Sequence, residues 1–332
     1  MSPRPLLRGA ALLAAAALVV TGCGSDDDTG STAGSDGGSS SSGAFPVTVT
    51  TAFGDVEIEE EPTRVVALGW GDAETALALG VQPVGASDWL AFGGEGVGPW
   101  SEGLYDEAPE LIETTEPSFE AIAALEPDLI LDTKSDGTQE RYDLLSQIAP
   151  TIGAPEGVGA FQTTYGQQLE LVGQALGRTD EADELAAEVA DAFETAAAEN
   201  EAFAGTEVAV VAFTSEGFNA YVQGDTRVDF MEELGFVNKP AIQDQATSSF
   251  YIPVSEEQVS LLDSGLTVAF PIFVEAAEFT SNPLWQALPS VQEGRAVVLE
   301  DEALANAFSI GTAPSIRYAL ENAVPLFAEA LA

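Results

Sequence analysis

Residues 117–132 (PSFEAIAALEPDLILD) have a partial repeat at residues 255–269 (SEEQVSLLDSGLTVA). Each copy begins with a serine suited to cap a helix, because its hydroxyl can accept a hydrogen bond from a backbone N–H of the first turn. Each copy ends in a short apolar run typical of a buried strand. The matched pairs are Ser118 with Ser255, Glu120 with Glu257, Ile122 with Val259, Leu125 with Leu262 and Leu129 with Leu266. A helix–strand unit that occurs twice, far apart in the chain, predicts two similar lobes.

The order of elements in each half is typical of an α/β protein. Residues 64–68 form a buried apolar run, residues 72–80 a helical pattern, and residues 81–86 a second strand-like run. This alternation predicts a lobe with a parallel sheet. In the second half we expect strands at 207–213, 220–223, 266–273 and 295–299 and helices at 227–234 and 314–331. A chain of 332 residues is long enough for about two domains.

One long helix is predicted between the two halves. Residues 179–205 have an amphipathic pattern that Thr179 can cap, and Gly205 is a suitable residue to follow its end. About 25 helical residues would span roughly 37 Å, enough to cross from one lobe to the other. We therefore expect an N-terminal lobe at 45–178, a rigid connecting helix at 179–205, and a C-terminal lobe at 206–332.

The N-terminus has the pattern of an export signal. Arg4 and Arg8 precede an apolar run at residues 10–20, which is too short to span a membrane. The residues before Cys23, the only cysteine, resemble a bacterial lipobox, in which the cysteine is lipidated and becomes the new N-terminus. The alternative is an ordinary secretory signal with an incidental cysteine. We expect a signal peptide at 1–22 and a flexible Gly/Ser/Asp-rich tether at 23–44.

The composition excludes several classes of function. The net charge is −45, and removal of the signal peptide leaves only eight of the ten basic residues. Nucleic-acid binding needs a basic surface patch, so we expect none. The chain has no histidine, which excludes catalytic triads with histidine and zinc sites with histidine. No phosphate-binding or nucleophile motif is present either, so we do not expect an enzyme.

Several short motifs together resemble the substrate-binding lipoproteins of ABC transporters, within the iron–siderophore and cobalamin group. The matching segments are 62–68 (PTRVVAL), 79–85 (LGVQPVG), 119–130 (FEAIAALEPDLI), 254–258 (VSEEQ), 282–289 (NPLWQALP) and 315–320 (SIRYAL). The resemblance is strongest to actinobacterial ferric-siderophore binders. It implies two Rossmann-like lobes joined by one rigid helix, with modest closure on the ligand.

The resemblance also implies that one exposed glutamate on each lobe pairs with arginines of the membrane permease. By motif these residues are Glu120 and Glu257, although Glu256 adjoins the second one. The alternative is that a glutamate in the first turn of a helix only complements the helix dipole, a contribution of about 0.3–1 kcal/mol.

Aromatic and basic residues at predicted strand ends are the candidates for ligand binding. Ligands of open α/β sheets bind beyond the carboxyl ends of the strands, and the loop at 87–107 has no core periodicity. Arg141 is interpreted instead as part of a solvated helix face, and Arg317 is either a pocket residue or a structural ion-pair partner. The candidates are Trp70, Trp89, Phe92, Trp100, Lys134, Tyr221, Arg227, Phe250, Tyr251, Phe273 and Arg317.

Charge favours one class of siderophore. A ferric catecholate carries several negative charges and would need clustered cations, whereas hydroxamate complexes are neutral or cationic. We therefore expect a ferric hydroxamate of the ferrioxamine type, whose iron is held by the chelator and needs neither a protein ligand nor a cofactor. Cobalamin or haem binding and a structural role at the cell surface are the alternatives. The expected form is a monomer, lipid-anchored at the extracellular face of the cell membrane and partnered by an ABC permease.

Overall fold

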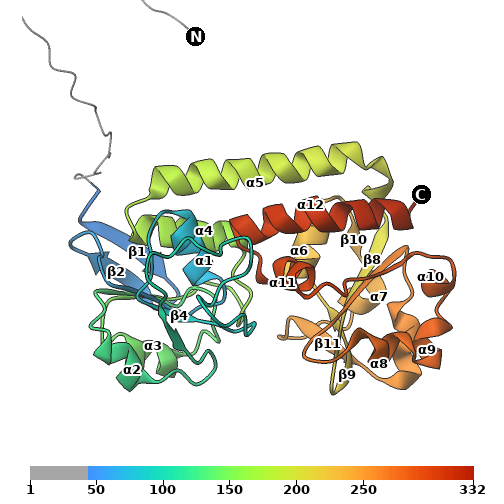
Figure 1. Cartoon of the computed structure of the whole chain (residues 1–332), viewed down its shortest axis with the longest axis horizontal. Helices are drawn as coiled ribbons and strands as arrows, with labels where there is room; N and C mark the ends of the chain where they lie inside the picture. The colour runs from blue at the N-terminus through green and yellow to red at the C-terminus, as the bar shows by residue number, and fades with distance from the viewer. Residues whose placement is uncertain (1–43) are drawn as a thin grey trace, which may run out of the picture. The chain divides into compact units, whose positions relative to one another are not determined.

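The computed structural model describes residues 44–332. The predicted signal peptide, the lipidation of Cys23 and nearly all of the predicted tether lie outside the described residues. Among the helices of 44–332, none is both long and apolar enough to cross a membrane. The described part of the chain forms two large sheets and one two-stranded sheet with helices around them, as the α/β prediction requires (Figure 1).

The first sheet is fully parallel and has the strand order β5-β4-β3-β6-β7. The chain enters this sheet at the central strand β3, adds β4 and β5 toward one edge, and then adds β6 and β7 on the other side of β3. Its strands are β3 (Val65–Ala67), β4 (Gly85–Ser87), β5 (Glu110–Ile112), β6 (Leu129–Leu131) and β7 (Thr151–Ile152). The helices of this lobe are α1 (Asp72–Ala78), α2 (Phe119–Ala124), α3 (Gln139–Leu145) and α4 (Tyr165–Ala175). An antiparallel hairpin of β1 (Val47–Thr51) and β2 (Gly54–Ile58) was not expected from the sequence.

The second sheet is mixed, with the order β11-β9-β8-β12-β13 and β10 beside the start of β8. β8, β12 and β13 run parallel, whereas β9 and β11 are antiparallel to their neighbours. The strands are β8 (Glu207–Thr214), β9 (Gly217–Tyr221), β10 (Val237–Asn238), β11 (Tyr251–Val254), β12 (Leu266–Pro271) and β13 (Ala296–Val298). The helices are α6 (Thr226–Glu233), α7 (Pro240–Gln243), α8 (Ala276–Thr280), α9 (Pro283–Gln286), α10 (Pro289–Gln292), α11 (Glu302–Ile310) and α12 (Ala313–Ala330).

The two copies of the repeated stretch differ in helix type. Ser118 caps α2, because its Oγ accepts a hydrogen bond from the backbone N–H of Ala121 at 3.2 Å. The second copy forms a 3-10 helix over Glu256–Leu262 instead of an α-helix. There the Ser255 hydroxyl donates to Gln258 Oε1 at 3.1 Å and accepts no capping hydrogen bond. The strand that follows each copy is buried, as predicted.

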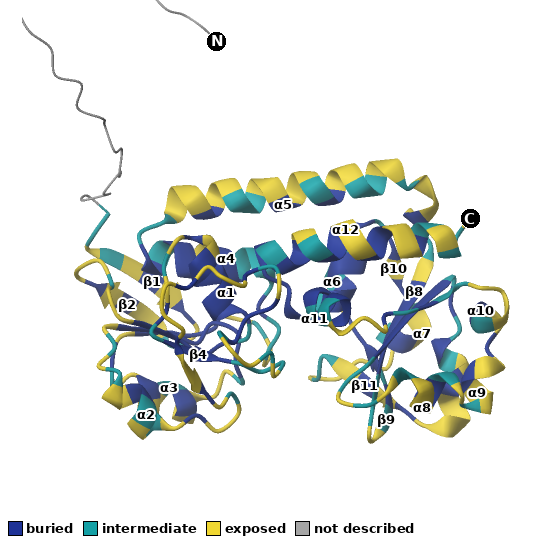
Figure 2. Ribbon diagram, in the orientation of Figure 1, coloured by how far each residue is buried: buried dark blue, intermediate teal, exposed yellow. Residues whose placement is uncertain are grey.

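The long helix α5 (Thr179–Glu199) contacts the cores of both lobes. Ala182 near its start packs into the core of the first sheet, and Phe193 near its end packs into the core of the second. The helix ends at Glu199 rather than near Gly205, and a 3-10 turn follows it at Glu201–Phe203. α12 runs beside α5 (Figure 1), and the outward face of α5 is exposed (Figure 2).

Candidate ligand-binding cleft

The strand order of the first sheet places a ligand site at its centre. The direction of strand addition reverses between β3 and β6, and ligands of open α/β sheets bind beyond the carboxyl ends of the strands at such a point. β3 leads to Trp70 and β6 leads to Lys134, and the backbone N–H of Trp70 donates to the carbonyl of Lys134 at 2.9 Å. Gly69 is required at this turn, because a Cβ there would lie 2.7 Å from the backbone nitrogen of Lys134.

A buried carboxylate holds these two turns together. Asp72 Oδ2 accepts hydrogen bonds from the backbone N–H groups of Gly69 at 2.9 Å and Thr133 at 3.0 Å. Its other oxygen accepts from Gln168 Nε2 on α4 at 2.6 Å. Burial raises the pKa of Asp72 and the hydrogen bonds from Thr133 oppose the shift. Asp72 is the first residue of α1, after Gly71 at the N-cap position, and its side chain braces the floor of the cleft.

Three stacked rings form an aromatic wall above this floor. Trp70 stacks on Trp89 with ring centroids 4.0 Å apart and on Phe161 with centroids 4.2 Å apart. Phe250, from the second lobe, meets Trp70 edge-on at 6.4 Å. Phe161 is held at φ 60°, a costly conformation for a bulky residue, and such strain is typical of functional sites. We call Trp70, Trp89 and Phe161 the aromatic wall.

The wall borders a cavity of about 460 Å³ that residues of both lobes line. We call this cavity the main chamber. Its lining is Trp70, Asp88, Trp89, Glu113, Thr114, Thr115, Ala212, Thr214, Glu216, Asn219, Tyr221, Arg227, Phe250, Tyr251, Ile272 and Phe273. Aromatic rings with a few polar groups are the usual lining of a small-molecule site.

Arg227 supplies the guanidinium of the main chamber. Its Nη1 pairs with Asp225 Oδ2 at 3.0 Å, and its guanidinium carbon lies 4.1 Å from the ring centroid of Tyr221. Arg227 is only 3% exposed, and its Nε–H has no hydrogen-bond partner in residues 44–332. The ion pair and the ring fix the guanidinium plane, and the Nε–H remains a buried donor without a partner in the described residues.

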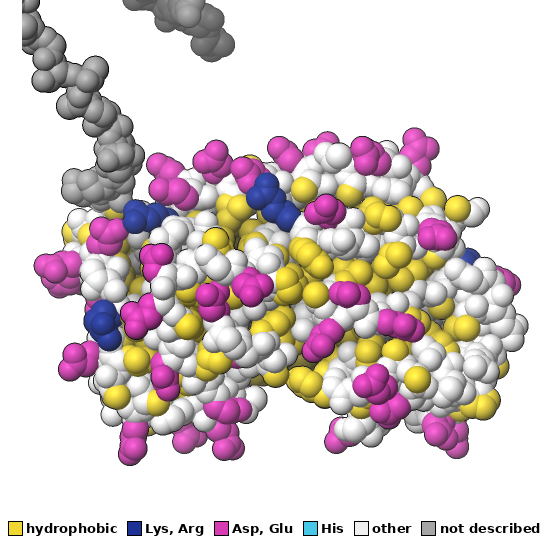
Figure 3. Space-filling view, viewed as in Figure 1, with side chains coloured by type: hydrophobic (Ala, Val, Ile, Leu, Met, Phe, Trp, Pro, Cys, Tyr) yellow, Lys and Arg dark blue, Asp and Glu magenta, His cyan; other side chains and the backbone are white. Residues whose placement is uncertain are grey.

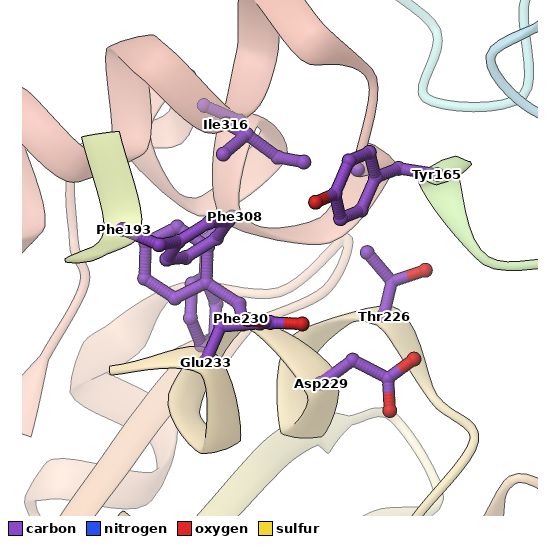
Figure 4. Close-up of a pocket in the computed structure, with 10 residues that line it drawn as sticks. Tyr165, Phe193, Thr226, Asp229, Phe230, Glu233, Phe308 and Ile316 are labelled. Carbon is purple, nitrogen blue, oxygen red and sulfur yellow. The ribbon is translucent and has the colours of Figure 1, made fainter. Parts of the chain in front are cut away.

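Lys134 connects the two lobes at the base of the cleft. It is buried, and its Nζ donates to Thr226 Oγ1 at the start of α6 at 2.5 Å. Burial lowers the pKa of Lys134 to about 8, while Asp225 and Asp229 oppose the shift. Beside this contact, Thr226, Asp229 and Tyr165 line a cavity of about 20 Å³, which is enough for one water molecule (Figure 4).

Comparison with known proteins decides the family. Residues 65–303 match the periplasmic binding protein family. The chain belongs to this family. Among its relatives is a probable siderophore-binding lipoprotein of Bacillus subtilis, 30% identical over 280 residues, which cover 76% of this chain and 80% of the relative.

Solved structures of similar proteins agree with this assignment. A Streptococcus pneumoniae iron-uptake substrate-binding protein in complex with ferrichrome superposes with a TM-score of 0.74 and 26% identity, covering 86% of this chain and 98% of that protein. A periplasmic solute-binding protein of Mycobacterium smegmatis has a TM-score of 0.75 and 28% identity, covering 86% of this chain and 99% of that one. The two-lobed α/β prediction is confirmed.

Most of the candidate ligand residues of this periplasmic binding protein lie around the cleft. Trp70, Trp89, Lys134, Tyr221, Arg227, Phe250, Tyr251 and Phe273 line the main chamber or the small cavity of about 130 Å³ behind the aromatic wall. Phe161 was missed by the sequence analysis. It lies in a segment without periodicity, and its left-handed backbone leaves no signal in a sequence.

Trp100 and Phe92 do not line any of these cavities. Trp100 Nε1 donates to the buried carboxylate of Glu74 at 2.7 Å, and its ring packs on Tyr318 of α12. Phe92 meets Trp100 edge-on with ring centroids 5.8 Å apart. Their predicted ligand contacts stay predictions, and the contacts of Trp100 with α1 and α12 do not favour its contact with a ligand.

The two arginines outside the main chamber were misinterpreted in part. Arg317 is exposed and pairs with Glu188 on α5 at 3.0 Å, which corrects its assignment to the pocket in favour of the structural ion pair. Arg141 was predicted on a solvated helix face, but it is buried and pairs with Asp132 at 2.8 Å. Its Nη1 also donates to the carbonyl of Thr114, so it ties α3 to two loops of the cleft.

The docking candidates Glu120 and Glu257 lie on α2 and on the 3-10 helix of the second lobe. Both are exposed, as contact with a permease requires. Acidic side chains are spread widely over the visible surface, with few basic ones among them (Figure 3). Exposure alone therefore does not single out these two glutamates.

Proposed function

We propose that the protein captures a ferric siderophore of the hydroxamate type in the main chamber and delivers it to an ABC permease. The observation that carries this proposal is the lining of the chamber, which combines stacked aromatic rings with the guanidinium of Arg227. A ferric hydroxamate has an apolar outer surface and oxygen acceptors around the iron. The aromatic rings suit the apolar outer surface, and the Nε–H of Arg227 suits an oxygen acceptor.

Charge supports the hydroxamate class over anionic chelates. The chamber lining includes the carboxylates of Asp88, Glu113 and Glu216, and its one guanidinium is already paired with Asp225. A polyanionic catecholate or citrate complex would meet net repulsion there, whereas a neutral or cationic complex would not. The iron remains inside the chelator in this proposal and takes no protein ligand.

The proposal extends to the arrangement at the membrane. The lipobox-like residues before Cys23 support a lipid anchor at the extracellular face of the cell membrane, with the tether at 23–44 leading to lobes at 45–178 and 206–332 around the helix at 179–205. Glu120 and Glu257 are the proposed contacts with the permease, one on each lobe. The proposed form is a monomer without a cofactor, and the proposed activity is binding rather than catalysis.

Tryptophan fluorescence of the purified domain tests the ligand class, because Trp70 and Trp89 line the chamber. We expect submicromolar ferrichrome or ferrioxamine B to quench it, and ferric enterobactin, ferric citrate, cobalamin and haem to bind far more weakly. Trp89→Phe should remove much of the quenching, whereas Trp285→Phe, a change in the buried core of the second lobe, should not. Binding of cobalamin or haem without any hydroxamate would overturn the proposal.

A further inference from the structure

A second cavity adjoins the main chamber. Its volume is about 730 Å³, and it lies at the second lobe between the segment after β12 and helix α11. Trp89, Arg227, Ile272 and Phe273 line both cavities, so the two are direct neighbours. We call the second cavity the side chamber.

The charges of the side chamber are almost all negative. Its titratable lining consists of the carboxylates of Glu275, Glu278, Glu300 and Glu302 and the guanidinium of Arg227. All four glutamates are exposed, and in residues 44–332 no lysine or arginine forms an ion pair with them. Arg227 is itself neutralised by Asp225. A positive group in this chamber would therefore be attracted and would meet no repulsion from an unpaired cation.

The side chamber also has apolar lining residues, some of which it shares with the main chamber. Leu90, Ile272, Ala276 and Leu299 contribute to its lining, and Phe273 stands at the junction with 80% of its surface exposed. Phe273 is held at φ 54°, which is a strained conformation for a bulky residue. An alkyl chain that passes through this junction would cover the exposed ring and place its end among the carboxylates.

Arg227 is a second feature of this junction, independent of the glutamates. It is 3% exposed, it lines both chambers, and its Nε–H lacks a partner in the described part of the chain. A buried donor without a partner is unfavourable, so an oxygen acceptor of a ligand is expected next to it. The junction therefore suits a molecule with an oxygen acceptor at Arg227, an alkyl segment beyond it, and a positive end.

We propose that the side chamber receives the cationic pendant chain of a linear ferric trihydroxamate whose chelate lies in the main chamber. This inference rests on the proposed function and narrows its ligand to chelates with an alkyl chain that ends in an ammonium group. A cyclic trihydroxamate would fill the main chamber alone. A chelate with a carboxylate at the same position would be repelled by the glutamates.

The test compares two chelates that differ only at the end of the chain. Ferrioxamine B carries a pendant ammonium group, and its N-acetylated form has the same chelate without that charge. We expect the wild-type domain to bind ferrioxamine B about five- to tenfold more tightly at low salt, a preference on the scale of one or two partly exposed ion pairs. The preference should shrink in 0.5 M NaCl to about twofold or less, because exposed charges are then screened.

Variants without the glutamate charges test whether the side chamber causes the preference for ferrioxamine B. Glu275→Gln with Glu278→Gln should reduce the ratio of the two affinities to near one, and glutamine retains the side-chain acceptor with which both residues cap α8. The matched control is Glu181→Gln with Glu184→Gln on the exposed face of α5, which removes the same charge elsewhere and should keep the wild-type ratio.

Each outcome has a separate meaning. Equal affinity of the wild type for the two chelates would overturn the pendant-chain inference and leave the proposed function standing. Binding of neither chelate would overturn the inference, and failure of ferrichrome to bind as well would contradict the proposed hydroxamate ligand. An equal loss of the ratio in the control variant would show that the preference comes from the overall negative charge, which also overturns the inference.

Discussion

Replacement of Arg141 by methionine should strongly destabilise the protein. The Arg141 side chain is 8% exposed and that of its partner Asp132 is 6% exposed, so the substitution leaves a buried carboxylate without its cation. It removes three N–H···O bonds to Asp132, at 2.8, 3.0 and 3.2 Å, and one at 3.1 Å to the carbonyl of Thr114. Breaking a buried pair from one side costs about 3–5 kcal/mol.

The same substitution at a surface pair is the matched control. Arg317 pairs with Glu188 at 3.0 Å, but their side chains are 54% and 46% exposed. Pairs of this kind contribute about 0–1 kcal/mol, because water screens them and two long side chains must be ordered. Arg317→Met should therefore lower the free energy of unfolding by less than about 1 kcal/mol, at least threefold less than Arg141→Met.

Urea unfolding followed by circular dichroism measures both effects. Burial raises the pKa of Asp132 to about 6, although Arg141 opposes the shift. Without Arg141 the pKa rises further, so the variant should lose more stability at pH 7.5 than at pH 5, where the carboxyl is protonated. The double variant Asp132→Leu with Arg141→Met should recover most of the loss. A loss below about 1 kcal/mol at pH 7.5, or no recovery in the double variant, would refute the reasoning.

Three further predictions concern the cleft and the permease. Arg227→Lys keeps a positive charge beside Asp225 but loses the planar guanidinium and its Nε–H, so the affinity for a ferric hydroxamate should fall about tenfold; unchanged affinity in a fluorescence titration would contradict the role of the guanidinium. Burial raises the pKa of Asp229 from 3.8 to about 6, so its contribution to stability is complete below pH 4 and is lost as the pH rises through 6. A tenfold change in an acid dissociation constant corresponds to about 1.4 kcal/mol. Between pH 4 and pH 7 the free energy of unfolding of Asp229→Asn, measured with urea, should therefore rise by up to about 3 kcal/mol relative to that of the wild type. Glu120→Ala with Glu257→Ala should block siderophore uptake by cells while the affinity for the ligand is kept; an equal fall in affinity would mean that these residues belong to the pocket or the fold.

The fold was largely predictable because buried parallel strands appear in a sequence as short apolar runs. The core strands β3, β6, β8 and β12 all coincide with such runs. The hairpin of β1 and β2 was missed, although its burial alternates along each strand. The end of α5 was placed too late, because the 3-10 turn after Glu199 continues the apolar pattern as far as the buried Phe203.

The sequence predicted the place of a site residue only where that residue follows the end of a predicted strand. Trp70 and Lys134 follow β3 and β6 directly, and their place at the centre of the sheet comes from the strand order. Trp89 and Trp100 lie in one loop without periodicity, yet one stacks in the cleft and the other bonds to Glu74. Partners so distant in the sequence leave no local pattern. The burial of Arg141 likewise depends on Asp132, which its own helix does not reveal.

Glu74 has a consequence for the rate of ligand capture. This buried carboxylate of α1 accepts hydrogen bonds from Trp100 Nε1 and from the hydroxyl of Thr312, which caps α12. The start of α12 is thus fastened to the first lobe, while its length packs into the core of the second lobe and beside α5. With two helices bracing the lobes, ligand encounter need not wait for a large domain swing. Stopped-flow quenching should show one phase whose rate rises linearly with ligand concentration, without a plateau set by closure.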